Sequence, residues 1–137
     1  AGFDFTLYIA TDVRKKFLGG STVCTRNGQR DLKLAPADAA RALEAQGAGE
    51  VLLYSIDRDG TWGGFDLGLL ESVTQAVSVP VVATGGAGSL AHIQSAVQQG
   101  GASAVAIGSM AVFQGQGLGV LIKFPSRQDQ LAIFEED

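Results

Sequence analysis

The chain has 137 residues, of which 46% are hydrophobic and 18% are charged, and its formal net charge is −4. This length and apolar content predict one folded domain spanning residues 1–137. The negative charge argues against binding to nucleic acids or membrane surfaces, since the only basic run, residues 14–16, is typical of a solvated turn. No apolar run reaches the roughly 18 residues of a membrane span, and residues 1–4 do not resemble a secretory leader. We therefore expect a cytoplasmic protein without nucleic-acid or membrane partners.

Four short apolar runs, rich in β-branched residues, predict strands at residues 5–10, 51–56, 79–83 and 104–107. Their residues are apolar in succession, which is typical of parallel strands covered on both faces. Helical spacing separates them at residues 36–46, 67–77 and 90–98, and a helix-like tail follows at residues 126–134. Pro36 suits a first helical turn, Asp66 and Ser89 suit N-caps, and Gly47 and Gly100 suit helix ends. The sequence therefore predicts an α/β fold of four consecutive parallel βα units.

The connection after the first strand is longer than the others and predicts an extra β-hairpin within residues 13–31. Gly19-Gly20 and Asn27-Gly28 are suited to its two turns. Cys24 lies in this hairpin, and as the single cysteine it excludes an internal disulfide. Because no histidine is near it in the sequence, we expect a buried thiol rather than a nucleophile.

Polar residues and glycines follow every predicted strand. In chain order they are Asp12, then Asp57, Asp59 and Gly60, then the TGGAG run at residues 84–88, and finally Gly108 and Ser109. The carboxyl ends of parallel strands meet at one edge of the sheet, which is the functional edge of such folds. Glycine loops can direct backbone N–H groups there toward a phosphate. A single glycine is explained equally well as a plain turn, but three such loops on one edge favour a phosphate site.

Four motifs, SIDRDGT, GFD, PVVATGGAGS and GGASAVAIGS, resemble the C-terminal half of the cyclase subunit of imidazole glycerol phosphate synthase, a lyase of histidine biosynthesis. RDGT also occurs in the sister isomerase family, whereas IDRDGT together with GFD favours the cyclase. The tail VLIKFPS resembles the branch of cyclase-like proteins found in surface-saccharide amidination. The resemblance implies a TIM barrel of eight βα units and about 250 residues, of which four units form a half-barrel.

The resemblance also implies roles for individual residues. Asp12 matches an aspartate that serves acid–base chemistry, while the family's second catalytic aspartate, at the end of the first barrel strand, has no equivalent here. Glu50 matches a charged residue that guards the entrance for ammonia from a glutaminase subunit, and a surface ion pair is the alternative. The residues matched to substrate binding are Asp59, near the substrate, and the phosphate-binding Gly60, Gly86, Gly108 and Ser109.

Several positions depart from the histidine-pathway cyclase and leave the substrate open. Tyr54 stands in place of a threonine, and residues 26–27 and 32–33 change the pattern of the hairpin. Trp62, just beyond Gly60, is suited either to a ligand lid or to an oligomer contact. His92, early in a predicted helix, is expected to be solvated or to cap that helix. For Gly86 we expect a bulky substitution to weaken phosphate binding with little loss of folding.

Two functions follow from these features. One is a cyclase-like enzyme in which ammonia from a glutaminase attacks a phosphorylated, sugar-derived substrate, with Asp12 as general acid–base. The other is a non-catalytic, self-assembling phosphate-binding half-barrel from a truncated or mobile gene. Four strands cannot close a barrel, so we expect a homo-oligomer, a dimer or a multiple of it, that brings two copies of Asp12 together. One histidine makes a metal site weak, and TGGAG lacks the full nicotinamide fingerprint, so no cofactor is expected.

Overall fold

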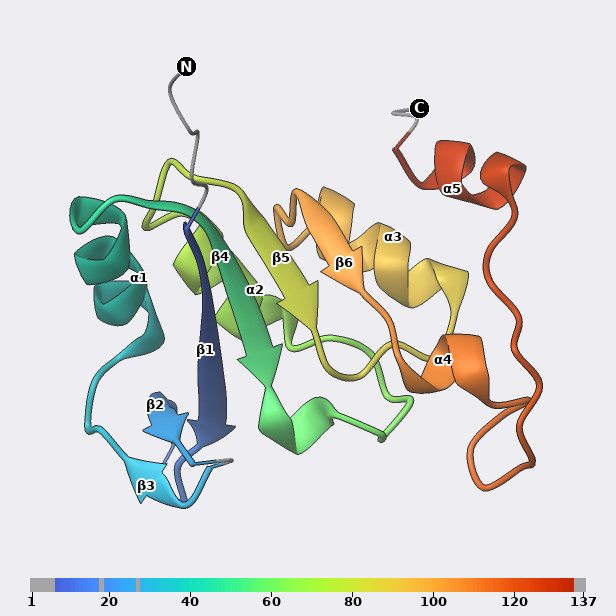
Figure 1. The fold of residues 1–137 in the computed structure, drawn as a ribbon, viewed down its shortest axis with the longest axis horizontal. Helices are drawn as coiled ribbons and strands as arrows, with labels where there is room; N and C mark the ends of the chain where they lie inside the picture. The colour runs from blue at the N-terminus through green and yellow to red at the C-terminus, as the bar shows by residue number, and fades with distance from the viewer. Residues whose placement is uncertain (1–6, 18, 27, 135–137) are drawn as a thin grey trace.

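The computed structural model describes residues 7–17, 19–26 and 28–134, which form one six-stranded sheet with helices beside it (Figure 1). The strands are β1 (Leu7–Lys15), β2 (Ser21–Thr25), β3 (Arg30–Asp31), β4 (Ala48–Ser55), β5 (Val81–Thr84) and β6 (Ala104–Ala106). The helices are α1 (Pro36–Ala45), the 3-10 turn η1 (Ile56–Arg58), α2 (Leu67–Thr74), α3 (Leu90–Gln98), α4 (Ser109–Val112) and α5 (Arg127–Phe134).

The strand order is β3-β2-β1-β4-β5-β6, and β1, β4, β5 and β6 are parallel. The arrows of these four strands in Figure 1 point to the same edge of the sheet. The α/β class, the four parallel strands and the extra hairpin after the first strand, all predicted from the sequence, are confirmed. No helix among the described residues is long and apolar enough to cross a membrane.

Strand β1 continues to Lys15, five residues beyond the end that the sequence predicts. The reason is the hairpin, because residues 12–15 of β1 pair antiparallel with β2, from Asp12 opposite Cys24 to Lys15 opposite Ser21. Asp12 therefore lies within a strand and not in a loop after it. Residues 5 and 6, the start of the predicted strand, lie outside the described residues.

One face of the parallel sheet forms the core. Val51 and Leu53 of β4 and Val81 of β5 are buried there, against α2 residues such as Leu70 and Val73. Leu52, Tyr54, Val82 and Thr84 alternate with these core residues on the other face and are only half-buried. The sequence predicts cover on both faces, whereas helices α1, α2 and α3 cover one (Figure 1).

Both outer edges of the parallel strands have free lengths. The hairpin pairs with β1 only along residues 12–15, so residues 7–11 have no strand on that side within the described chain. At the other end of the sheet, β6 pairs with β5 and no further described strand follows it. The half-buried face of the sheet and its two unpaired edges are therefore available to further strands.

Candidate functional site

A shallow hollow lies at the carboxyl ends of β4, β5 and β6, and we call it the glycine hollow. Five of the residues that line it were predicted from the sequence: Asp59, Gly60, Gly86, Gly108 and Ser109. The other lining residues are Thr84, Gly85, Ala87 and Ala106, from β5, its following loop and β6. Three separate loops therefore meet at this edge of the sheet, as their positions after parallel strands require.

Four of the five predicted residues of the hollow have unpaired backbone donors, whereas the N–H of the fifth, Asp59, donates to the carbonyls of Ser55 and Ile56. The N–H groups of Gly60, Gly86, Gly108 and Ser109 donate no hydrogen bond to any residue in the described part of the chain. Ser109 begins α4, where N–H groups lack partners within the helix. Several unpaired N–H groups around one concave surface are an arrangement that can hold an anion such as phosphate.

The two glycines at the centre of the site differ in their surroundings. Gly86 has a φ of 108°, and a Cβ atom there would collide with the carbonyl oxygen of Gly64. Gly64 in turn donates from its N–H to the Gly86 carbonyl at 2.8 Å, which holds the two loops together. Gly108 has a φ of −116°, and a Cβ there would meet no atom within 4 Å. The expectation that Gly86 tolerates substitution is therefore wrong, because its backbone conformation and close packing need glycine.

Asp12 belongs to the neighbouring strand and does not line the glycine hollow. Its Cα pairs with that of Tyr54 on β4, and its side chain is half-buried. The Tyr54 hydroxyl donates a hydrogen bond of 2.9 Å to the Asp59 carboxylate. Burial raises the pKa of Tyr54, and the bond to Asp59 and the charges of Asp59 and Asp12 raise it further. Tyr54 therefore lies beside Asp12 on the neighbouring strand and also contacts Asp59 at the rim of the hollow.

This connection was missed at the level of sequence, where Tyr54 was only a departure from the family pattern. The available signal was its spacing. A long side chain at the last inward-facing position of a strand can reach a residue in the loop that follows it. Asp59 comes five residues after Tyr54, just beyond η1.

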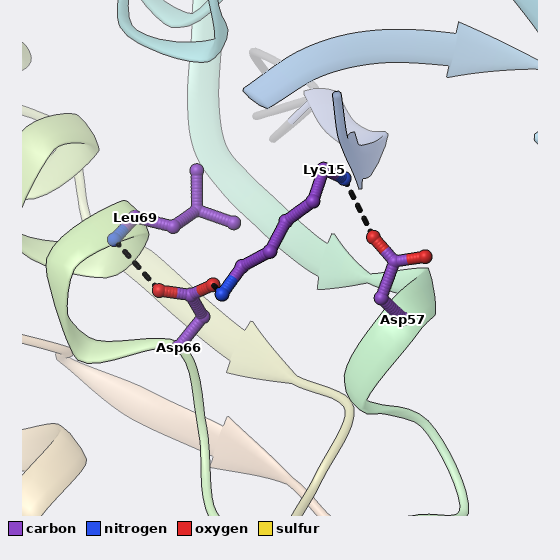
Figure 2. Close-up of polar contacts among 4 residues, drawn as sticks. All are labelled: Lys15, Asp57, Asp66 and Leu69. Carbon is purple, nitrogen blue, oxygen red and sulfur yellow. Dashed lines mark hydrogen bonds and ion pairs between the residues drawn. The ribbon is translucent and has the colours of Figure 1, made fainter. Parts of the chain in front are cut away.

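A second polar cluster fixes the hairpin beside this edge, and Figure 2 shows its contacts. The backbone N–H of Lys15 donates to Asp57 at 2.6 Å, and its ammonium lies 2.9 Å from Asp66. Asp66 also caps α2 by accepting a hydrogen bond from the N–H of Leu69. Burial would raise the pKa of Asp66, but the contacts with Lys15 and Leu69 outweigh it and lower the pKa. Lys15 is therefore not simply part of a solvated turn, as its sequence context predicted.

Glu50 lies at the opposite end of the sheet from the glycine hollow. It belongs to the first half of β4, pairs in register with residue 8 of β1, and its side chain is half-buried. It forms no ion pair with another described residue, so the surface ion pair considered from the sequence is absent from this part of the chain.

The two remaining candidates, His92 and Cys24, have surroundings that fit structural roles. The His92 ring accepts a hydrogen bond of 3.2 Å from the N–H of Gly88, in keeping with the expected capping role at the start of α3. Cys24 is buried as predicted, and burial raises the pKa of its thiol. Within the described ranges, no three His, Cys, Asp or Glu residues are grouped so that they could hold a metal ion.

The sequence profile of the family described as Histidine biosynthesis protein matches residues 3–116. The chain belongs to this family. Among its relatives, a candidate imidazole glycerol phosphate synthase subunit hisF2 of Pseudomonas aeruginosa is 49% identical over 114 residues, which cover 83% of this chain and 45% of the relative. The resemblance to the cyclase subunit that the sequence motifs indicate is thereby confirmed.

Two further members show how much of the protein is matched. A candidate imidazole glycerol phosphate synthase subunit HisF of Leptospira interrogans is 38% identical over 130 residues, covering 94% of this chain and 51% of the relative. The imidazole glycerol phosphate synthase subunit HisF of Myxococcus xanthus is 52% identical over 85 residues, covering 62% and 34% respectively. The chain thus spans about half the length of the Pseudomonas aeruginosa and Leptospira interrogans relatives. The match covers most of the chain itself.

Proposed function

We propose that the chain forms a cyclase-like half-barrel that binds a phosphorylated, sugar-derived substrate and contributes to a lyase reaction with ammonia. The observation that carries this proposal is the glycine hollow, where four residues with unpaired N–H groups, from three loops, line one concave surface. Its residues lie within the family match and belong to the motifs that resemble the cyclase.

The phosphate of the substrate occupies the glycine hollow in this account. The donors at Gly60, Gly86, Gly108 and Ser109 supply hydrogen bonds to its oxygen atoms without a cationic side chain. The Asp59 carboxylate lines the same hollow and would repel a phosphate placed against it. The Tyr54 hydroxyl donates to one oxygen atom of the Asp59 carboxylate at 2.9 Å. Asp59 is suited to accept a further hydrogen bond from a sugar hydroxyl.

Asp12 is the acid–base group of this proposal. It lies on the half-buried face, in the same strand row as Tyr54 and Thr84, at the edge where the loops of the hollow begin. A substrate whose phosphate rests in the hollow and whose sugar crosses Tyr54 would bring its reacting atoms toward Asp12. Ammonia would enter from a glutaminase subunit at the other end of the sheet, past Glu50.

A second copy of the chain completes the barrel. The half-buried face carries Leu52 and Val82, and β6 has an open edge. The free length of β1, residues 7–11, is available to the β6 of a partner, because the hairpin occupies only residues 12–15. In a closed barrel of eight strands, the two β1 strands lie opposite one another. The two copies of Asp12 then form the carboxylate pair that the family reaction needs.

The assembly is tested by sedimentation of the chain at micromolar concentration. We expect a dimer or a multiple of it, and Leu52→Glu, which places a charge on the inner face, should release monomers. Gln98→Glu, on the exposed side of α3, is the matched control and should leave the assembly intact. A stable monomer of the unmodified chain would contradict the dimer.

The reaction is tested by ammonium-dependent turnover in an imidazole glycerol phosphate synthase assay. General acid–base groups typically contribute about 10²–10⁴ in rate, so Asp12→Asn should remove most of the turnover and leave phosphate binding unchanged. Full activity in Asp12→Asn would refute its assigned role. Phosphate binding without any turnover in the assembled protein would instead support the non-catalytic half-barrel.

A further inference from the structure

Two of the loops that form the glycine hollow are packed directly against each other. One follows β5 and contains Gly86 and Gly88, and the other lies between η1 and α2 and contains Gly64. The N–H of Gly64 donates to the Gly86 carbonyl at 2.8 Å. A Cβ atom at Gly86 would collide with the carbonyl oxygen of Gly64, and one at Gly88 with that of Trp62. The position of Gly86, which lines the hollow, therefore depends on how closely the two loops fit.

The side chain of His92, in the first turn of α3, contacts both loops. Its ring Nδ1 accepts a hydrogen bond of 3.2 Å from the N–H of Gly88. On the other loop, a Cβ atom at Gly64 would lie 3.3 Å from the ring Cδ2 atom, so the ring packs against this glycine. The His92 N–H donates to the hydroxyl of Ser89 at 3.3 Å, which fixes the turn that carries the ring. His92 therefore does more than cap α3, because it holds the loop of Gly88 against the loop of Gly64.

The bond from Gly88 requires one protonation state of the ring. Because a backbone N–H only donates, Nδ1 must be without a proton, and the neutral ring carries its proton on Nε2. An imidazolium has a proton on both nitrogen atoms and accepts no hydrogen bond. Uptake of one proton by His92 therefore removes the bond to Gly88.

A change of charge near neutral pH can be assigned to this one ring. His92 is the only histidine of the chain. Imidazole is the only side chain that ordinarily changes its charge between pH 5 and 8, whereas carboxyl, amino and guanidinium groups keep theirs. Burial raises the pKa of the Cys24 thiol, so this group stays protonated throughout the range.

The surroundings of the ring contain charges of both signs. The loop after β5 and the rest of α3 have no charged side chain. The charged residues on the neighbouring elements are Arg58 of η1, Asp59 and Asp66 in the loop after it, Glu71 of α2, Lys123 before α5, and Arg127 and Asp129 of α5. None of these residues forms an ion pair with His92.

Protonation of His92 has two opposing effects on an anion in the glycine hollow. The added positive charge attracts the anion, whereas the loss of the bond to Gly88 loosens the loop that carries Gly86. The ring does not line the hollow and is only half-buried, and physiological salt screens such a charge over about 8 Å. The hydrogen bond acts on the loop directly. We therefore expect the loss of the bond to be the larger effect.

We propose that His92 is a positioning residue that makes anion binding in the glycine hollow depend on pH. When the ring is neutral, Nδ1 holds the Gly88 N–H and the loop presents Gly86 to the anion. When the ring is protonated, this bond is absent and the affinity for the anion falls. The inference rests on the proposed phosphate site and adds regulation of that site by a single proton.

The test is calorimetric titration with sulfate at pH 7.5 and at pH 5.5, in 0.15 M sodium chloride. Sulfate has the tetrahedral shape of phosphate, but unlike phosphate it takes up no proton in this range. We expect the unmodified chain to bind sulfate about two- to tenfold more weakly at pH 5.5, since the loss of one ordinary hydrogen bond amounts to that ratio.

Two variants separate the hydrogen bond from the charge. His92→Asn keeps an acceptor, because the side-chain oxygen can replace Nδ1, and it does not titrate. It should bind sulfate as tightly as the unmodified chain does at pH 7.5, and equally tightly at pH 5.5. His92→Phe keeps a ring against Gly64 but has no acceptor, so it should bind sulfate weakly at both pH values.

The outcomes separate this inference from the proposed function. An affinity of the unmodified chain that is unchanged or higher at pH 5.5 would overturn the role of His92 and leave the phosphate site standing. An equal fall in His92→Asn would also overturn it, since another group would then titrate. Full affinity of His92→Phe at pH 7.5 would show that the bond to Gly88 is not needed, with the same consequence. No binding of sulfate or inorganic phosphate at pH 7.5 would overturn both.

Discussion

The hydroxyl of Tyr54 donates a hydrogen bond of 2.9 Å to the carboxylate of Asp59, which joins the inner face of the sheet to the rim of the glycine hollow. Burial raises the pKa of Tyr54 above its ordinary value of 10.0, and the bond to Asp59 adds to this rise. Asp59→Asn should therefore lower the pKa of Tyr54, while burial keeps it above the ordinary value. The measurement is the absorbance titration of tyrosinate in a Tyr8→Phe background, because the chain has two tyrosines.

Asp57→Asn is the matched control for this titration. Asp57 lies in the same loop, and its carboxylate accepts from the Lys15 N–H and not from Tyr54. The pKa of Tyr54 should be nearly the same in this variant as in the unmodified chain. An unchanged pKa in Asp59→Asn would mean that the bond to Asp59 is absent in solution.

Gly86 and Gly108 should respond differently to the same substitution. Gly86→Ala places a Cβ against the Gly64 carbonyl at a positive φ, so it should lower the free energy of unfolding by about 1–3 kcal/mol. Gly108→Ala enters open space at an ordinary φ and should change it by less than about 0.5 kcal/mol. Urea unfolding at one fixed protein concentration measures both. Equal losses of unfolding free energy in the two variants would contradict the close packing of Gly86 and the open surroundings of Gly108.

The Lys15–Asp66 contact should make stability depend on pH. The pKa of Asp66 is lower in the folded chain than its ordinary 3.8, so its contribution is present above about pH 4 and is lost as the pH falls through the folded pKa. Lys15 is 54% exposed, which limits the contribution to about 0.2–1 kcal/mol. Asp66→Asn keeps a good N-cap and should be less stable than the unmodified chain at pH 6.

The difference between the two proteins should shrink at pH 3, because below its ordinary pKa of 3.8 the carboxyl of Asp66 takes up a proton in the unfolded chain more readily than in the folded chain. Urea unfolding at both pH values, with protein concentration held constant, measures it. A difference of the same size at pH 3 and pH 6 would show that the side chain acts through the cap alone and not through its charge.

Glu50 offers a prediction about the source of ammonia. If ammonia from a glutaminase enters past this residue, Glu50→Gln should lower glutamine-dependent turnover and leave ammonium-dependent turnover unchanged. Glu71→Gln, on the outer surface of α2, is the control and should affect neither. An equal fall in both rates would place Glu50 in the folding or chemistry of the half-barrel, and not at an entrance.

Much of this architecture could be predicted from the sequence because its signals are local. The apolar runs, Pro36 and the caps at Asp66 and Ser89 define the βα units, and the structure has both caps, accepting from Leu69 and His92. The glycine hollow was also predictable in outline, since loops that follow parallel strands must meet at one edge.

What could not be predicted depends on contacts between distant segments. The extension of β1 follows from pairing with β2, and the Lys15–Asp66 ion pair joins residues that are far apart in the chain. The strict need for glycine at position 86 arises from the Gly64 carbonyl, which belongs to another loop. Burial on both faces was predicted from apolar composition, which does not reveal whether the cover of a face belongs to the same chain.

The most direct test of the account is a titration of the isotope-labelled chain with inorganic phosphate, followed by the NMR signals of its backbone N–H groups. We predict that the signals of Gly60, Gly86, Gly108 and Ser109 shift together with a single dissociation constant. The signal of Gly117, which lies outside the glycine hollow, should stay in place. Unchanged signals from all four residues at millimolar phosphate would contradict a phosphate site at the carboxyl ends of the strands.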